Sequence, residues 1–128
     1  YAGKKGHIKR KKIISFLQKE NPDVLALQES YKSDIQGFYN TVDTIRELNH
    51  YPYIAEDYLF KNNHKQYFGA IIFSRYPILK KGSIPFPNES YNRCLWADIK
   101  VENDTIRFYN MHLGSIRLQR HFQALLIH

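Results

Sequence analysis

Cysteine, methionine and tryptophan each occur once in these 128 residues, and no apolar run approaches the length of a membrane helix. A single cysteine, Cys94, excludes a framework of internal disulfides. A membrane helix takes roughly 18 consecutive apolar residues, so we expect no membrane span within the chain. The sequence also lacks a glycine-rich phosphate loop, a GxSxG motif and a CxxC pair. These absences remove the usual motifs for P-loop nucleotide sites, serine hydrolases and dithiol redox sites.

Positive charge is present in excess, because 19 Lys and Arg residues against 12 Asp and Glu residues give a net charge of +7. Such a balance favours anionic partners: nucleic acid, phospholipid headgroups or phosphate esters. Part of the charge lies in KKGHIKRKK, residues 4–12, which is either a solvated approach to a helix or a phosphate-attracting patch. Nothing indicates an obligate protein partner. Localisation stays open, because the sequence begins with Tyr1 and shows no signal peptide.

Two segments have the apolar periodicity of amphipathic helices, and the expected helices cover residues 7–20 and about 35–48. Pro22 ends the first, because the residue before a proline avoids helical geometry. The expected apolar stripes consist of Ile13, Ile14, Leu17, Ile35, Phe38, Val42, Ile45 and Leu48. A third helix is expected to begin near Leu118.

Continuous or alternating apolar residues predict the strands. The expected strands cover residues 24–28, 68–74, 93–102 and 105–113, with further extended segments from Tyr51. Asn103-Asp104 is a hairpin signal between the last two strands. Residues 30–50 and 80–92 are expected to contain the loops around a site. The order indicates one mixed α/β domain with a sheet buried by helices.

The segment NPDVLALQES, residues 21–30, places a carboxylate at the end of an apolar strand. Continuous apolar residues from Val24 to Leu27 are typical of a strand covered on both faces. Ligand sites gather at strand ends in α/β sheets, and a carboxylate there is costly unless it is paired or bound to a cation. Since Mg²⁺ takes oxygen ligands and often few protein carboxylates, Glu29 is a candidate metal ligand. The alternative is a solvated residue or a cap at the strand end.

The segment RFYNMHLGS, residues 107–115, contains the second candidate. Strand periodicity puts Ile106, Phe108, Asn110 and His112 on one face, which turns from apolar to polar along the strand. His112 is a candidate general acid or base, or else a histidine bonded to a neighbouring strand. Arg93 is a candidate for a bidentate phosphate contact, or else a surface ion-pair residue.

Four segments together carry a family resemblance. NPDVLALQES resembles the "PDIIxLQE" segment of the endonuclease/exonuclease/phosphatase superfamily, which has the deoxyribonuclease I-like fold. FGAIIFSRYPI resembles its "GxAIxSRYPI" segment, and NRCLWADI and DTIRFYNMHLGS resemble its "R…v.l" and "vxNxHL" strands. They occur in family order, and the last two are most similar to variants from Bacteroidota. The resemblance implies an α/β (α+β) fold, part of a four-layered α/β-sandwich.

The resemblance also implies roles for single residues. Glu29 would bind Mg²⁺ or Mn²⁺, and His112 would be the catalytic histidine at the scissile phosphate. Arg93 and Asn110 would contact the substrate phosphate, and for Asn110, as for Arg75, a structural role is the alternative. The implied function is a metal-dependent phosphoesterase, in which water attacks phosphorus in line. Phosphate esters, including nucleic acid or phospholipid, are the implied substrates.

The sequence departs from the family pattern in three places. A first strand ending in a metal-site Asn, a "GDFN" segment and an "SDH" segment do not occur in it. We therefore expect residues 1–128 to be a partial domain that lacks the first strand and the C-terminal half, with an incomplete active site and no activity alone. The alternatives are a basic, non-catalytic nucleic-acid-binding module and a degenerate family member kept as a scaffold.

Overall fold

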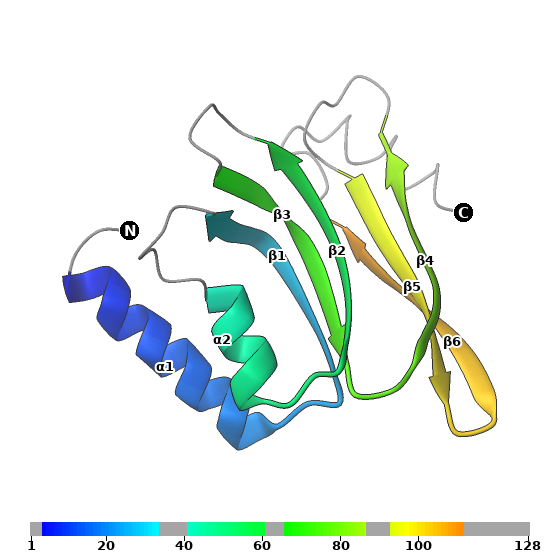
Figure 1. Cartoon of the computed structure of the whole chain (residues 1–128), viewed down its shortest axis with the longest axis horizontal. Coiled ribbons are helices and arrows are strands. Elements are labelled where there is room, and N and C mark those ends of the chain that lie inside the picture. The colour runs from blue at the N-terminus through cyan, green and yellow to red at the C-terminus, as the bar shows by residue number, and fades with distance from the viewer. Residues whose placement is uncertain (1–3, 34–40, 61–65, 87–92, 112–128) are drawn as a thin grey trace.

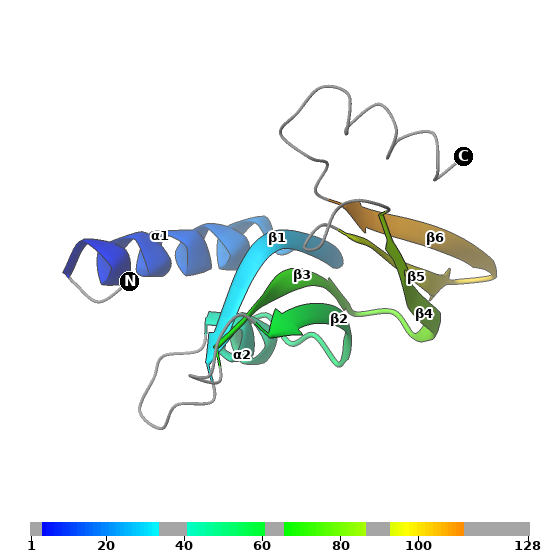
Figure 2. The same cartoon turned by 90° about the horizontal axis from the view of Figure 1, so that it is seen from above.

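Two antiparallel sheets and two helices make up the computed structural model, which describes residues 4–33, 41–60, 66–86 and 93–111 (Figures 1 and 2). The elements in chain order are α1 (Lys4–Glu20), β1 (Val24–Ser33), α2 (Thr41–Leu48), β2 (Tyr53–Phe60), β3 (Gln66–Ser74), β4 (Ile78–Pro85), β5 (Arg93–Val101) and β6 (Asp104–Met111). The strand orders are β1-β3-β2 in the first sheet and β4-β5-β6 in the second. The predicted C-terminal helix lies outside the described residues.

The two sheets pack face to face, and both helices cover the outer face of the first sheet, so the described part has three layers. Strand β3 belongs to both cores. Its residues Ile71 and Phe73 face the helices, while Ile72 faces the second sheet, and all three are completely buried. The expected incomplete α/β-sandwich is therefore confirmed, and β3 is the strand that contributes to the cores on both faces of the first sheet.

Strand β1 is longer and less buried than the sequence predicted. It extends to Ser33 instead of Gln28, and Ala26 is exposed. The expectation that Val24–Leu27 would be covered on both faces was therefore wrong for the described part. In the strand order of that part, β1 pairs only with β3, so its other edge has no neighbour there.

Three further expectations are corrected. Ile13 and Leu48 lie outside the apolar stripes and are 51% and 46% exposed; because a helix turns 100° per residue, a buried line through Ile14 leaves Ile13 at its side. Part of the expected 80–92 loop is strand β4, whose side chains are mostly exposed. The hairpin turn is Glu102-Asn103, one residue earlier than predicted, with φ 57° at Glu102.

Neither helix in the described ranges is long and apolar enough to cross a membrane.

Gly69 in β3 has no room for a side chain against strand β2. A Cβ atom there would overlap the backbone of Asp57 and Tyr58, the former through its carbonyl oxygen. We expect Gly69→Ala to lower the free energy of unfolding by about 2–3 kcal/mol, because overpacking forces backbone shifts. Gly82→Ala is the control: the atoms nearest to its Cβ would belong to the Trp96 ring, a side chain that can move. Urea titration of both variants measures the free energy of unfolding. A larger decrease for Gly82→Ala than for Gly69→Ala would contradict this reasoning.

Candidate functional site

The layer between the two sheets is apolar along most of its length and polar at one end. The apolar part contains Ala55, Ile72, Leu95, Ala97 and Ile99, all buried. Further along the same strands, four inward-facing polar residues follow: Asp57 of β2, Ser83 of β4, Arg93 of β5 and Asn110 of β6. We call this group the polar end. The predicted change from apolar to polar along β6 is confirmed for Phe108 and Asn110.

Glu29 lies in a β-bulge at the level of the polar end. Leu27 pairs with Ile71 and Ser30 pairs with Gly69, so Gln28 and Glu29 together lie opposite one residue of β3. That residue, Ala70, is paired on its other side with Asp57. Bulges re-aim side chains and are over-represented beside active sites. The backbone therefore brings Glu29 to the same sheet level as Asp57, while its side chain lies outside the described residues.

Two reciprocal hydrogen bonds connect the bulge to the end of β6. The Asn110 amide donates to the carbonyl oxygens of Leu27, at 2.8 Å, and Ile71, at 3.0 Å. In return, the Gln28 side-chain amide donates to the carbonyl oxygen of Met111. We call the Asn110–Leu27 and Gln28–Met111 hydrogen bonds the cross-sheet latch. It joins two consecutive residues of β1 to two consecutive residues of β6.

The latch bears directly on the two principal candidates. Glu29 is the next residue after Gln28, and His112 is the next residue after Met111. The structure thus brings together the chain segments that carry both. His112 itself lies outside the described residues, so the latch concerns only the backbone that leads to it.

Arg93 faces Asp57 across the gap between the sheets. Its Nη1 lies 3.7 Å from Asp57 Oδ1, while the Ser83 hydroxyl donates a hydrogen bond to the other carboxylate oxygen. Arg93 therefore forms an ion pair, which was the alternative to a phosphate contact. However, 3.7 Å is too long for a hydrogen bond, and within the described ranges no residue accepts one from Arg93. With respect to the described residues, the guanidinium therefore keeps donors that can bind an anion.

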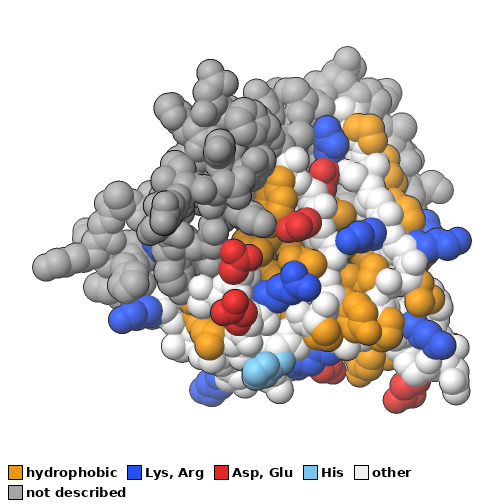
Figure 3. Space-filling model, in the orientation of Figure 1, with side chains coloured by type: hydrophobic (Ala, Val, Ile, Leu, Met, Phe, Trp, Pro, Cys, Tyr) orange, Lys and Arg blue, Asp and Glu red, His pale blue; other side chains and the backbone are white. Residues whose placement is uncertain are grey.

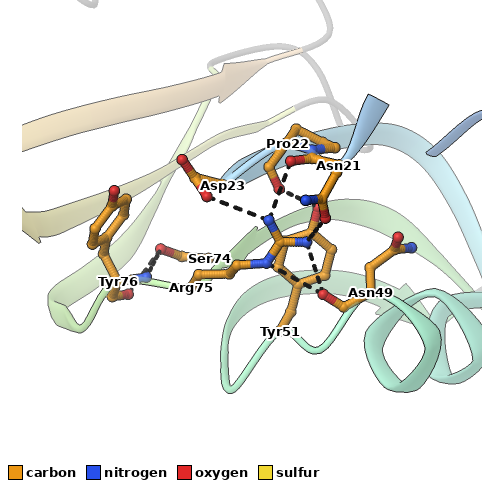
Figure 4. Close-up of polar contacts among 8 residues, drawn as sticks. All are labelled: Asn21, Pro22, Asp23, Asn49, Tyr51, Ser74, Arg75 and Tyr76. Carbon is orange, nitrogen blue, oxygen red and sulfur yellow. Dashed lines mark hydrogen bonds and ion pairs between the residues drawn. The ribbon is translucent and has the colours of Figure 1, made fainter. Parts of the chain in front are cut away.

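Arg75, in contrast, is surrounded by its own chain (Figure 4). It donates to the Asn49 carbonyl at 2.9 Å, to the Asp23 carboxylate at 3.3 Å and to Asn21, and it lies 5.0 Å from the centre of the Tyr51 ring. These contacts tie the α1–β1 turn to the end of α2, at the end of β3 away from the polar end. Its role is structural.

Arg107 is paired with Asp98 on the outer face of the second sheet. It makes two hydrogen bonds to Asp98, at 2.6 and 2.9 Å, and stacks 4.1 Å from the centre of the Trp96 ring. The Arg107 hydrogen bonds hold the pKa of the Asp98 carboxyl below its usual value. On the face shown in Figure 3, Lys and Arg side chains are scattered, and Asp and Glu side chains lie among them.

A metal site was expected at Glu29. Among residues of the described ranges, no three His, Cys, Asp or Glu side chains gather closely enough to hold an ion. The Glu29 carboxylate lies outside this description. Its chemistry fits a hard divalent cation, since Mg²⁺ is often held by one or two protein carboxylates together with water and substrate oxygens.

Comparison with known proteins gives the family. The family model described as "Endonuclease/Exonuclease/phosphatase family" matches residues 2–127. Among solved structures, a family protein from Leptotrichia buccalis is similar at 17% identity with a TM-score of 0.71, covering 99% of this chain and 58% of that one. Truncated TDP2 from Caenorhabditis elegans is similar at 20% identity with a TM-score of 0.65, covering 93% of this chain and 44% of that one.

This chain therefore spans about half the length of these two solved relatives. No match was found among curated proteins. The structural neighbours support the fold, and the family model covers nearly every residue of the sequence. Phosphoester hydrolysis of the nuclease or phosphatase type is the general activity of that family. The chain belongs to the endonuclease/exonuclease/phosphatase family.

Proposed function

We propose that the protein is a divalent-metal-dependent phosphoesterase in which water attacks phosphorus in line. The observation that supports this most is the cross-sheet latch. It joins the segment leading to Glu29 to the segment leading to His112, at the one end of the inter-sheet layer that is polar. Family membership supplies the reaction class.

Three side chains would share the work. Arg93 would bind a phosphate oxygen through its free donors, because a guanidinium fork matches phosphate geometry. His112 would exchange a proton at the phosphate, a step worth roughly 10² to 10⁴ in rate. Glu29 would hold Mg²⁺ or Mn²⁺, which when bound supplies a Lewis acid for the developing oxyanion charge. Both amide protons of Asn110 are engaged with main-chain carbonyls, which favours a positioning role over a phosphate contact.

The substrate class is a phosphate ester, with nucleic acid and phospholipid as the two main candidates. The net charge of +7 would attract either polyanion. The rival function, a non-catalytic nucleic-acid-binding module, requires no metal and predicts affinity that falls steeply with salt. It does not account for hydrogen bonds between the strand segments that lead to Glu29 and to His112.

The proposal predicts hydrolysis that depends on Mg²⁺ or Mn²⁺ and is abolished by EDTA. We would test DNA, RNA, sphingomyelin and inositol phosphates. Because the matched relatives are longer, the assay compares residues 1–128 with any longer chain that contains them, and we expect residues 1–128 alone to be inactive. Salt-sensitive nucleic-acid binding without turnover in the longer chain would favour the rival.

A further inference from the structure

The arginines at positions 75, 93 and 107 differ in how their donors are used. Arg75 donates to several acceptors, Arg107 makes two hydrogen bonds to Asp98, and each lies against an aromatic ring. Arg93 contacts only a carboxylate at 3.7 Å among the described residues. Its side chain is 38% exposed. Among the described residues, Arg93 is therefore the one of these three that lies at the polar end, is held by an ion pair and makes no hydrogen bond.

Asp57 is the restraint, and it is itself anchored. Its carboxylate is only 16% exposed, and such a group is costly to bury unless it is paired. The Ser83 hydroxyl occupies Oδ2, so Oδ1 is the oxygen turned to Arg93. The three residues come from β2, β4 and β5 and thus span both sheets. This arrangement fixes the position of the carboxylate relative to the polar end.

We propose that Asp57, anchored by Ser83, is a positioning residue that presents the Arg93 guanidinium to a phosphate group of the substrate. The inference rests on the proposed function, because it names the phosphate as the ligand of Arg93. The Asp57 carboxylate attracts the guanidinium from one side. At 3.7 Å it is too far to accept a hydrogen bond, so it does not occupy the Arg93 donors. Glu29 shares this sheet level, since Ala70 separates it from Asp57.

A carboxylate beside an arginine can also weaken anion binding by competing for it. Two effects therefore oppose each other when Asp57 loses its charge. The electrostatic gain is small, because partly exposed ion pairs are screened by solvent. The loss is larger, because a long side chain released from its restraint must be immobilised again when phosphate binds. We therefore expect the lost restraint on Arg93 to outweigh the electrostatic gain, so that phosphate binds more weakly.

The test measures the dissociation constant of the complex between the full protein and inorganic phosphate. Phosphate is titrated in the presence of EDTA, which removes metal ions, and binding is followed by NMR of the arginine Nε–H groups. Asp57→Asn should weaken phosphate binding about three- to tenfold, the range expected for immobilising one flexible side chain. Arg93→Ala should weaken it further. In the Arg93→Ala background, Asp57→Asn should cause no additional loss, since Asp57 acts through Arg93. Ser83→Ala should give a smaller loss in the same direction.

Asp98→Asn is the matched control, because it breaks a second Asp–Arg pair away from the polar end. It should change stability but leave phosphate affinity unaltered. Tighter phosphate binding by Asp57→Asn, or an equal loss with and without Arg93, would overturn the inference. If Asp57→Asn does not fold, the same cycle with Ser83→Ala decides. If the Asp57→Asn and Arg93→Ala variants affect phosphate binding as expected but the protein hydrolyses no ester, the proposed function is rejected and the phosphate subsite at Arg93 is retained.

Discussion

Replacing Glu29 by Gln is expected to reduce metal-dependent hydrolysis by about 10² to 10³, the usual cost of deleting one group that stabilises transition-state charge. The glutamine keeps the size of the side chain and one oxygen, but it loses the negative charge that a hard divalent cation requires. Activity should recover partly at high Mg²⁺ concentration, because the defect is in metal affinity. Rates measured over a Mg²⁺ series would show this shift.

Two variants control this result. Glu102→Gln changes an exposed glutamate in the β5–β6 turn, at the far end of β6 from Met111, and should keep the wild-type rate and Mg²⁺ dependence. His112→Ala should lower the rate by roughly 10² to 10⁴, because it removes the proton transfer at the phosphate. It should not shift the Mg²⁺ dependence. If Glu29→Gln and His112→Ala each leave the rate within a few-fold of wild type, the proposed function is wrong.

Much of the fold could be predicted from sequence because its periodicities are strong. The buried line through Ile14 and Leu17, the apolar run of β3 and the alternation of β5 all matched the structure. Strand β4 was missed because edge strands with exposed lysines resemble loops. The bulge at Gln28-Glu29 was not predictable either, since it is a property of pairing with β3 and not of β1 alone.

The candidate site was predicted only in part, for a similar reason. The position of Asn110 on the inward face follows from strand periodicity, but its partners in the other sheet do not. Asp57 was overlooked, although it lies two residues after Ala55 and so shares its inward face. Its significance depends on Ser83 and Arg93, which only the tertiary structure brings to it. Pairs between sheets have no fixed spacing in sequence.

The largest effect on stability is expected from Asn110→Asp. Asn110 is 3% exposed, and its amide donates to two carbonyl oxygens at 2.8 and 3.0 Å. A carboxylate would place negative charge against both acceptors. We expect the free energy of unfolding to fall by about 3–5 kcal/mol at pH 7, the cost of an uncompensated buried charge. Asn110→Ala should lose less, about 1–3 kcal/mol, because it only leaves carbonyl groups unpaired.

The pH dependence separates repulsion from a simple loss of packing. In the folded Asn110→Asp variant the pKa of the new carboxyl group would be raised, because burial and two carbonyl oxygens oppose its charge. The folded state then binds the proton more tightly than the unfolded state. The stability deficit should be small below about pH 4, the unfolded value, grow as the pH rises and level off above the folded pKa. Urea titrations of Asn110→Asp, Asn110→Ala and wild type at several pH values measure it.

Asn103→Asp, in the exposed β5–β6 turn, provides the matched comparison and should change stability by no more than about 0.5 kcal/mol. A deficit for Asn110→Asp that did not vary with pH would mean that the amide is not donating to Leu27 and Ile71. In that case the latch would not hold the bulge against β6, and the segments that carry Glu29 and His112 would lose the contact that joins them. The same titration therefore tests the contact on which the proposed active site depends.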